Sequence, residues 1–96
     1  MYYFNLAGSQ FHLSTPVHSL VIHLLAPDGM IHVYSLSSHE YSYGYKVLGY
    51  RCSSPNTCCF RDSICDFRLT SISKFVRFID DMISDGFHLV FVQQGD

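Results

Sequence analysis

The stretch VHSLVIHLLAPDGMIHVYSL, residues 17–36, decides the fold. Two runs rich in β-forming residues flank the tripeptide Pro27-Asp28-Gly29. Proline presets φ for a turn, aspartate suits the next position, and glycine can take the left-handed conformation of a bulge. This combination predicts an antiparallel β-hairpin with a three-residue loop.

The register of this hairpin assigns its side chains to two faces. It places four pairs of residues opposite each other: Ala26 and Met30, Leu24 and His32, Ile22 and Tyr34, and Leu20 and Leu36. The other face carries Val21, His23, Leu25, Ile31 and Val33. Because both faces are apolar, we expect the hairpin to lie in the centre of a sheet or to be covered on both sides.

A helix is predicted over about residues 71–85, within TSISKFVRFIDDMISDG. Its apolar residues recur with helical spacing, at Ile72, Phe75, Val76, Ile79, Met82 and Ile83. Thr70 or Ser71 can cap its start, and Gly86 can end it. The apolar run 87–92 that follows predicts a buried, central strand, and a crossover through the helix leaves room for parallel pairing.

Shorter segments complete the predicted sheet. Residues 40–51 and 58–69 are plausible strands, joined by the turn-rich residues 53–57. Residues 2–7 are expected to form an edge strand and residues 8–16 a loop. The 96 residues therefore predict a single α+β domain with a mostly antiparallel sheet of five or six strands and one amphipathic helix packed on one face.

All four cysteines lie in RCSSPNTCCFRDSIC, residues 51–65. A tight turn centred on Pro55-Asn56 would place Cys52 opposite Cys59, at a separation that a disulfide can span. Zinc sites usually use cysteine pairs separated by two to four residues, and the spacing C-x5-C-C-x5-C differs from that pattern. Reduced structural thiols are favoured, with one disulfide or a zinc-stabilised domain as alternatives, so we expect no metal and no cofactor.

Charge is sparse and unevenly distributed. Only 15% of residues are charged, against about 25% in an average soluble domain, and the net charge is −2. Residues 1–49 carry only Asp28, Glu40 and Lys46. We expect part of this charge-poor half to contact a partner or a second copy, which makes a homodimer reasonable. The net charge gives no general attraction to nucleic acid or acidic membranes.

Two groups of residues are candidates for binding a partner. Tyr41, Tyr43 and Tyr45 share one face of the predicted strand, where tyrosine offers large contact area and a hydroxyl. One or two of these rings could instead pack beneath the helix. The second group lies towards the C-terminal end of the predicted helix and comprises Asp80, Asp81 and Asp85. The helix dipole disfavours acids at that end, so they indicate either an acidic partner surface or a solvated face.

The sequence contains none of the common catalytic motifs, such as a phosphate-binding glycine loop or His-Glu-x-x-His, so we expect no enzyme and no catalytic residues. The N-terminus has no basic stretch before a long apolar run, so the cytoplasm is the expected location. A small non-enzymatic protein-binding module is the favoured interpretation.

An inhibitor-type accessory protein of a virus or mobile element, such as an antagonist of a host nuclease or defence protein, is the expected kind of module. That last step rests on small size and lack of motifs rather than on any residue. The alternative is a single-stranded nucleic-acid binder whose tyrosines stack on bases. The arginines nearest to those tyrosines are Arg51, Arg61 and Arg68, which could hold the phosphates.

Overall fold

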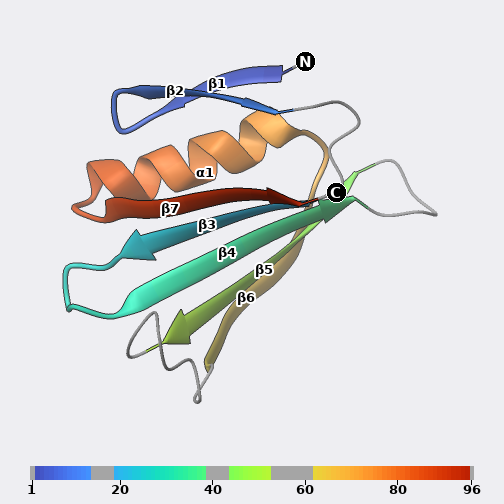
Figure 1. The fold of residues 1–96 in the computed structure, drawn as a ribbon. Coiled ribbons are helices and arrows are strands. Elements are labelled where there is room, and N and C mark those ends of the chain that lie inside the picture. Colours follow the sequence, from blue (N-terminus) through green and yellow to red (C-terminus); the bar gives the residue numbers. More distant parts are fainter. Residues whose placement is uncertain (1, 14–18, 39–43, 53–61, 96) are drawn as a thin grey trace.

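The computed structural model describes residues 2–13, 19–38, 44–52 and 62–95, which Figure 1 shows as ribbons. Their elements are β1 (Tyr2–Leu6), β2 (Ser9–Leu13), β3 (Ser19–Leu25), β4 (Ile31–Ser38), β5 (Tyr45–Cys52), β6 (Asp62–Leu69), α1 (Ile72–Ser84) and β7 (His88–Gly95). Strands β3 to β7 form a five-stranded sheet of order β6-β5-β4-β3-β7, in which all neighbouring strands are antiparallel. β1 and β2 form a separate two-stranded sheet. The predicted α+β class is confirmed.

The loop Pro27-Asp28-Gly29 joins β3 to β4 in the predicted register. The paired residues include Leu20 with Leu36, Ile22 with Tyr34, and Leu24 with His32. The Ala26 N–H donates to the Met30 carbonyl at 2.8 Å, and the Gly29 N–H donates to the Ala26 carbonyl at 3.0 Å. Gly29 has a φ of 88°, the left-handed conformation that the turn requires.

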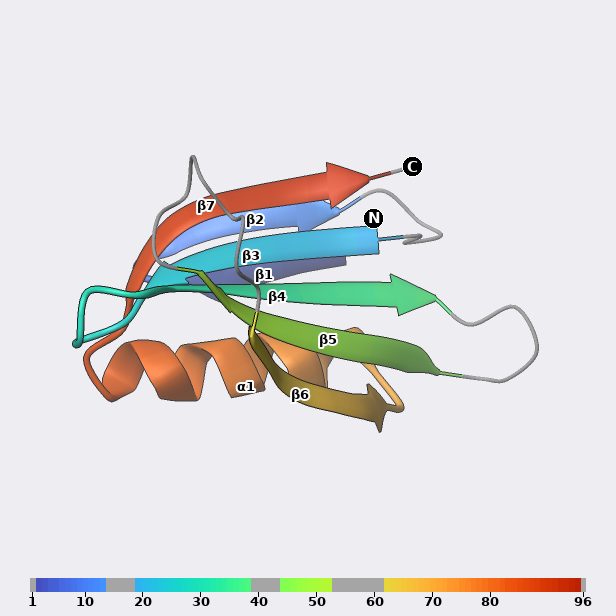
Figure 2. The same cartoon turned by 90° about the horizontal axis from the view of Figure 1, so that it is seen from below.

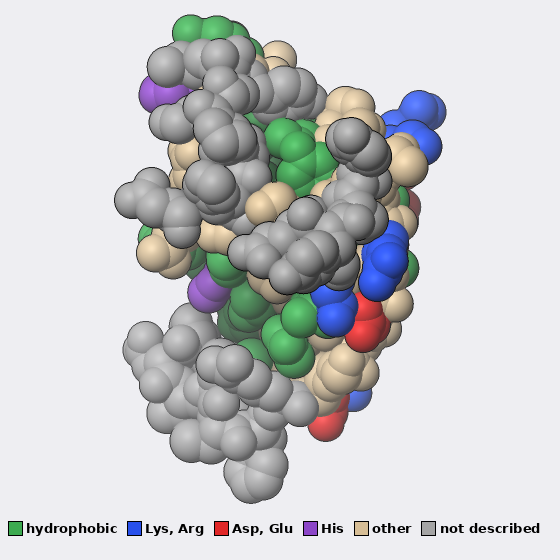
Figure 3. All heavy atoms as spheres, turned by 90° about the vertical axis from the view of Figure 1, so that its right-hand side faces the viewer, with side chains coloured by type: hydrophobic (Ala, Val, Ile, Leu, Met, Phe, Trp, Pro, Cys, Tyr) green, Lys and Arg blue, Asp and Glu red, His purple; other side chains and the backbone are tan. Residues whose placement is uncertain are grey.

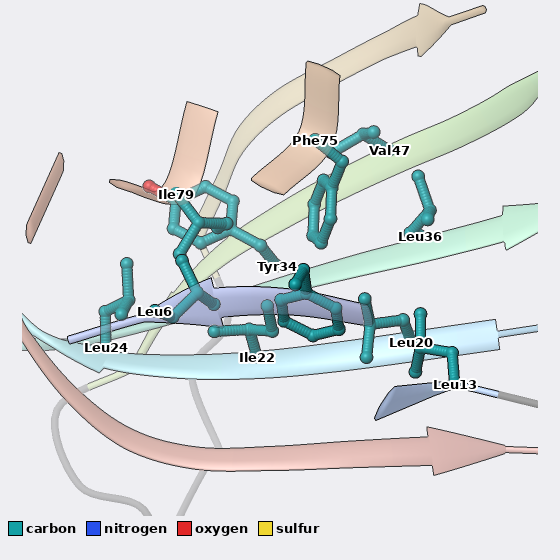
Figure 4. Close-up of a cluster of buried hydrophobic side chains, with 11 residues drawn as sticks. Leu6, Leu13, Leu20, Ile22, Leu24, Tyr34, Leu36, Val47, Phe75 and Ile79 are labelled. Atoms are coloured by element: carbon teal, nitrogen blue, oxygen red, sulfur yellow. The ribbon is translucent and has the colours of Figure 1, made fainter. Parts of the chain in front are cut away.

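Helix α1 and the β1–β2 hairpin lie side by side on one face of the five-stranded sheet (Figures 1 and 2). Both contribute to one apolar core, whose buried residues are Phe4, Leu6, Leu13, Leu20, Ile22, Leu24, Tyr34, Leu36, Val47, Phe75 and Ile79. Figure 4 shows the side chains of the sheet, helix and hairpin converging between the two layers. Burial of this apolar surface, worth roughly 25 cal/mol per Å², holds the second layer on the sheet.

Both ends of α1 are capped as the sequence predicts. The Ser71 side chain accepts a hydrogen bond from a backbone N–H of the first turn. At the other end, Gly86 has a φ of 103°. The Gly86 N–H donates to the Ile83 carbonyl at 3.2 Å, and the Phe87 N–H donates to the Met82 carbonyl at 3.1 Å. These two bonds form a Schellman motif, which ends the helix.

The predicted central position of residues 87–92 is wrong. β7 is an edge strand that pairs only with β3 among the described elements. Helix α1 leads from β6 at one edge of the sheet to β7 at the other, so these two strands do not pair and the predicted parallel pairing is absent from the described sheet. The apolar run suits an edge strand as well, because one side of β7 packs against the core through Leu89 and Val92.

The expected loop over residues 8–16 is also wrong, because β2 occupies Ser9–Leu13. The two residues that connect β1 to β2, Ala7 and Gly8, both have positive φ, at 52° and 79°. This is the backbone of a two-residue hairpin turn, whose first position usually holds Asn, Asp or Gly. Alanine at that position gives no sequence signal for the turn.

The tight-turn register for β5 and β6 is wrong as well. Arg51 lies opposite Asp62, whereas a turn centred on residues 55 and 56 would place it opposite residue 60. Pro-Asn, unlike Asn-Gly, does not fix a two-residue hairpin. The predicted pairing of Cys52 with Cys59 lies outside the described residues.

Candidate functional site

The two groups of candidate partner-binding residues lie in different parts of the structure. Tyr45 is partly buried and packs against the core, on the side of β5 that also carries the buried Val47. It pairs with Leu69, three residues before α1 begins, whereas Asp80 and Asp81 lie in the second half of that helix. A helix of 13 residues is about 20 Å long, so the tyrosine and the acids lie towards opposite ends of it. Tyr41 and Tyr43 lie outside the described residues.

The three acids lie at the predicted end of α1. Asp80 and Asp81 are exposed, and Asp85 caps the helix. The helix has no acidic residue in its first turn and no basic residue in its last. Among the residues with described positions, none of the three carboxylates forms an ion pair. The unfavourable interaction with the helix dipole therefore stands, and the acidic partner surface stays a prediction.

The arginines proposed for phosphate binding do not gather either. Arg51 lies on the helix-covered side of the sheet and forms an ion pair with Asp62 at 3.3 Å. Arg68 lies opposite Lys46, on the other side of the sheet. Arg61 lies outside the described residues. A phosphate-binding groove along the tyrosines therefore has no described pair of arginines on one face.

A larger group of neighbouring side chains lies on the face of the five-stranded sheet that points away from α1. We call this face the open face where its side chains reach solvent, because no helix or strand of the described residues lies over it (Figure 2). At one end, Ile31 and Cys52 lie on the same side of the sheet but are buried, so the open face ends before them. Its central residues alternate with the core residues along each strand and are Val21, His23, Leu25, Val33, Ser35, Leu48, Tyr50 and Phe91. The first seven of these are intermediate in exposure and Phe91 is exposed, whereas their core neighbours Leu20, Ile22 and Leu24 are fully buried.

The residues of the open face form continuous rows across the sheet. One row runs from Phe91 through His23 and Val33 to Tyr50. The row beside it runs from Gln93 through Val21 and Ser35 to Leu48. Cross-strand neighbours of this kind lie about 5 Å apart, so the apolar members of both rows make one patch.

Charge is absent from most of this face. The strands β7, β3 and β4 contain no Asp, Glu, Lys or Arg. The described lysines and arginines all lie on β5, β6 and α1, and are Lys46, Arg51, Arg68, Lys74 and Arg77. In the view of Figure 3, the coloured Lys, Arg and acidic side chains lie along one side.

His23 lies among apolar neighbours on the open face. Its ring meets the ring of Phe91 edge to face, with centroids 5.3 Å apart. Burial lowers the pKa of His23, since the charged form loses hydration there. The neutral imidazole that results adds contact area without adding charge.

Both edge strands of the sheet carry β-bulges. In β7, Leu89 and Phe91 pair with successive residues of β3, which leaves Val90 as the extra residue, 51% exposed. In β6, Ile64 is the extra residue in the same way and is 38% exposed. Bulges at sheet edges disrupt the ladder and discourage pairing with another strand. These two exposed side chains are therefore part of edge protection.

A second cluster of reactive residue types lies under α1, on the covered face. His32 Nδ1 and the Tyr34 hydroxyl are 3.0 Å apart, and the His32 ring meets Phe87 edge to face. Burial, together with the nearby Cys65, raises the pKa of Tyr34 to about 12. Burial and then Asp66 raise the pKa of the Cys65 thiol. A protonated thiol and phenol are weak nucleophiles, so the cluster has the character of a packed core.

The described cysteines do not share a site. Cys52 is buried and Cys65 is partly buried. Cys65 pairs with Gly49 and faces α1, whereas Cys52 faces the other side of the sheet. Cys58 and Cys59 lie outside the described residues. Among the remaining residues, no three His, Cys, Asp or Glu side chains are placed to hold a metal ion.

Comparison with known proteins gives no relative for this chain, since no family model, no curated protein and no solved structure matches it. Within the described part of the chain, no helix has the length and apolar character needed to cross a membrane.

The sequence predicts only some of the residues of the open face. It assigned Val21, His23, Leu25, Ile31 and Val33 to one face of the hairpin, and the hairpin was expected to be central or covered on both sides. β3 and β4 are interior strands, as the first alternative expects, while all of these residues except Ile31 keep some exposure. Phe91 was missed, because the nearly continuous apolar run 87–92 predicts a buried strand, whereas Phe91 is exposed. The bulge at Val90 has no clear signal in the sequence HLVFVQQG.

Proposed function

We propose that this chain is a small, non-catalytic protein-binding module that binds with its open face. The observation that supports the proposal is the uncharged patch that crosses β7, β3 and β4 and includes the exposed Phe91 of β7. Exposed apolar patches edged by polar residues are typical of protein interaction sites. Depletion of charge at the centre of a patch, with aromatic residues present, is also typical of them.

An inhibitor-type role, as in accessory proteins of viruses or mobile elements, would require no more than such a surface. A module of this kind acts by occupying its partner. The acidic end of α1 lies on the other side of the molecule from the open face, so it would serve a different contact.

The test compares the two surfaces in one affinity-capture experiment on extracts of the cells that make the protein. We expect Leu48→Asp, which puts a carboxylate on the open face, to lose proteins that the wild type captures. The matched control is the triple charge reversal Asp80→Lys, Asp81→Lys and Asp85→Lys on α1. If the control loses the captured proteins and Leu48→Asp keeps them, binding belongs to the acidic surface and the open-face proposal is wrong.

A further inference from the structure

We infer that the open face binds a second copy of this chain, so that two sheets pack face to face about a two-fold axis. The inference rests on the proposed function, because it names the partner of the same surface. The sequence predicts a homodimer through the charge-poor N-terminal half. The inference drawn from the structure is narrower, because the contact uses one face of β7, β3, β4 and β5.

Symmetry makes the lack of charge informative. In a two-fold contact the same patch lies on both sides, so a patch with one sign of charge would meet itself and repel. The strands β7, β3 and β4 have no charged side chain of the Asp, Glu, Lys or Arg type. The charges on the open side lie at the β5–β6 end and are of both signs, at Lys46, Asp66 and Arg68. The centre of the contact is therefore neutral, and its rim can pair opposite charges.

The area of the face is that of a weak dimer. Four strands at about 4.8 Å spacing and about seven residues of about 3.3 Å give a face of roughly 19 by 23 Å. Two such faces would remove about 900 Å² from solvent, which is slightly less than the roughly 1,000 Å² expected of a stable biological interface. We therefore expect self-association in the micromolar range.

The shape of the face also suits sheet packing. Two sheets pack face to face about 10 Å apart when apolar side chains of moderate size interdigitate. Val33 and Ser35 lie on β4, the middle strand of the five, with Val21 and Leu48 on the flanking strands. Pairing of two edge strands is the competing arrangement, but the bulges at Val90 and Ile64 oppose it.

The first experiment is sedimentation analysis of the wild type over about 1 to 100 μM, a range that covers micromolar dimers. We expect a mass of twice 11.0 kDa at the upper end. Val33→Asp, which places a charge in the middle of the contact, should weaken self-association at least about 30-fold. Ser73→Asp adds the same charge on the exposed side of α1 and should leave the dimer intact.

Two further variants keep the inference falsifiable. If Val33→Asp does not fold, as judged by circular dichroism, Phe91→Asp replaces it, because that side chain is 47% exposed. Val90→Lys places a charge at the edge of β7. If Val90→Lys breaks the dimer and Val33→Asp leaves the dimer intact, the contact joins two sheet edges and the inference is wrong.

A wild type that stays monomeric at about 100 μM also overturns the second-copy inference. That result leaves the proposed function standing as long as Leu48→Asp loses a captured protein. A different result is a dimeric wild type together with a Leu48→Asp variant that captures the same proteins as the wild type. In that case the open face serves self-association alone, and the proposal that it binds other proteins is wrong.

Discussion

The two faces of the five-stranded sheet use similar side chains in different surroundings. On the covered face, Leu20, Ile22 and Leu24 are fully buried beneath α1 and the β1–β2 hairpin. On the open face, Val21, His23 and Leu25 come from the same strand and keep part of their surface in solvent. The difference arises from the second layer, which covers one face only. Apolar side chains on both sides of a strand therefore do not establish that both sides are covered within one chain.

The largest expected difference between the faces is in the response to truncating a phenylalanine. Phe75→Ala should lower the free energy of unfolding by about 3–5 kcal/mol, because Phe75 is fully buried and would leave a cavity. Phe91→Ala should cost about 1 kcal/mol, because nearly half of that side chain is already exposed. Urea denaturation of dilute protein, which keeps it monomeric, measures both. Equal losses would mean that the open face is part of the core.

Gly49 tests how tightly the covered face is packed. A Cβ at this position would lie 2.5 Å from Cys65 Sγ and 2.9 Å from the Tyr34 ring. Both groups sit between the sheet and α1, so neither can move away freely. Gly49→Ala should therefore destabilise the protein by about 1–3 kcal/mol, measured by urea denaturation.

A double variant gives the control for this overpacking. Cys65→Ala removes the sulfur, so Gly49→Ala should cost less in that background than in the wild type. The same cost in both backgrounds would contradict a clash with Cys65 and leave the Tyr34 ring as the obstacle.

Acid should destabilise the fold through His32 on the covered face. Burial lowers the pKa of His32, nearby Arg51 lowers it further, and Asp28 raises it in part. The folded pKa thus lies below that of the unfolded chain, about 6.5, so the unfolded chain binds more protons as pH falls. Stability is therefore present above about pH 6.5 and is lost as pH falls through the folded pKa.

Thermal melts at about pH 7.5 and about pH 5 measure this effect. The melting temperature should fall on acidification, and His32→Gln should reduce that fall while keeping a polar group near the Tyr34 hydroxyl. The pKa of His23 on the open face is also lowered, so the double variant His32→Gln, His23→Gln should show a still smaller fall in melting temperature. An unchanged fall in both variants would assign the acid sensitivity to other groups.

The parts of the fold that the sequence predicts are those where a residue type determines the backbone. Pro27-Asp28-Gly29 sets the register of β3 and β4, and Ser71 and Gly86 set the ends of α1. Strand order is not determined in this way, since the apolar run of β7 suits a central strand as well as an edge strand with one covered side. The position of the bulges depends on the partner strand, so Val90 could not be predicted.

The candidate site was predictable to the same extent. Alternation along β3 and β4 correctly grouped Val21, His23 and Val33, but the layer that decides which group is buried comes from distant parts of the chain. Tyr45 was proposed either for a partner or for packing beneath the helix. It shares a side with Val47 and packs against the core, which agrees with the second alternative.

The smallest expected effect concerns the exposed side of α1, where neither face of the sheet is involved. Ser84→Lys places a cation in the last turn, which has no basic residue, and four residues after Asp80. The helix dipole and an acid-before-lysine pair both favour it, so the free energy of unfolding should rise by about 0.3–1 kcal/mol. Ser73→Lys, in the first turn, is the matched control and should be neutral or destabilising. Because salt screens exposed charges, the gain should shrink in about 1 M NaCl. A gain from both variants would show that net charge, rather than the helix dipole, determines the stability of this surface.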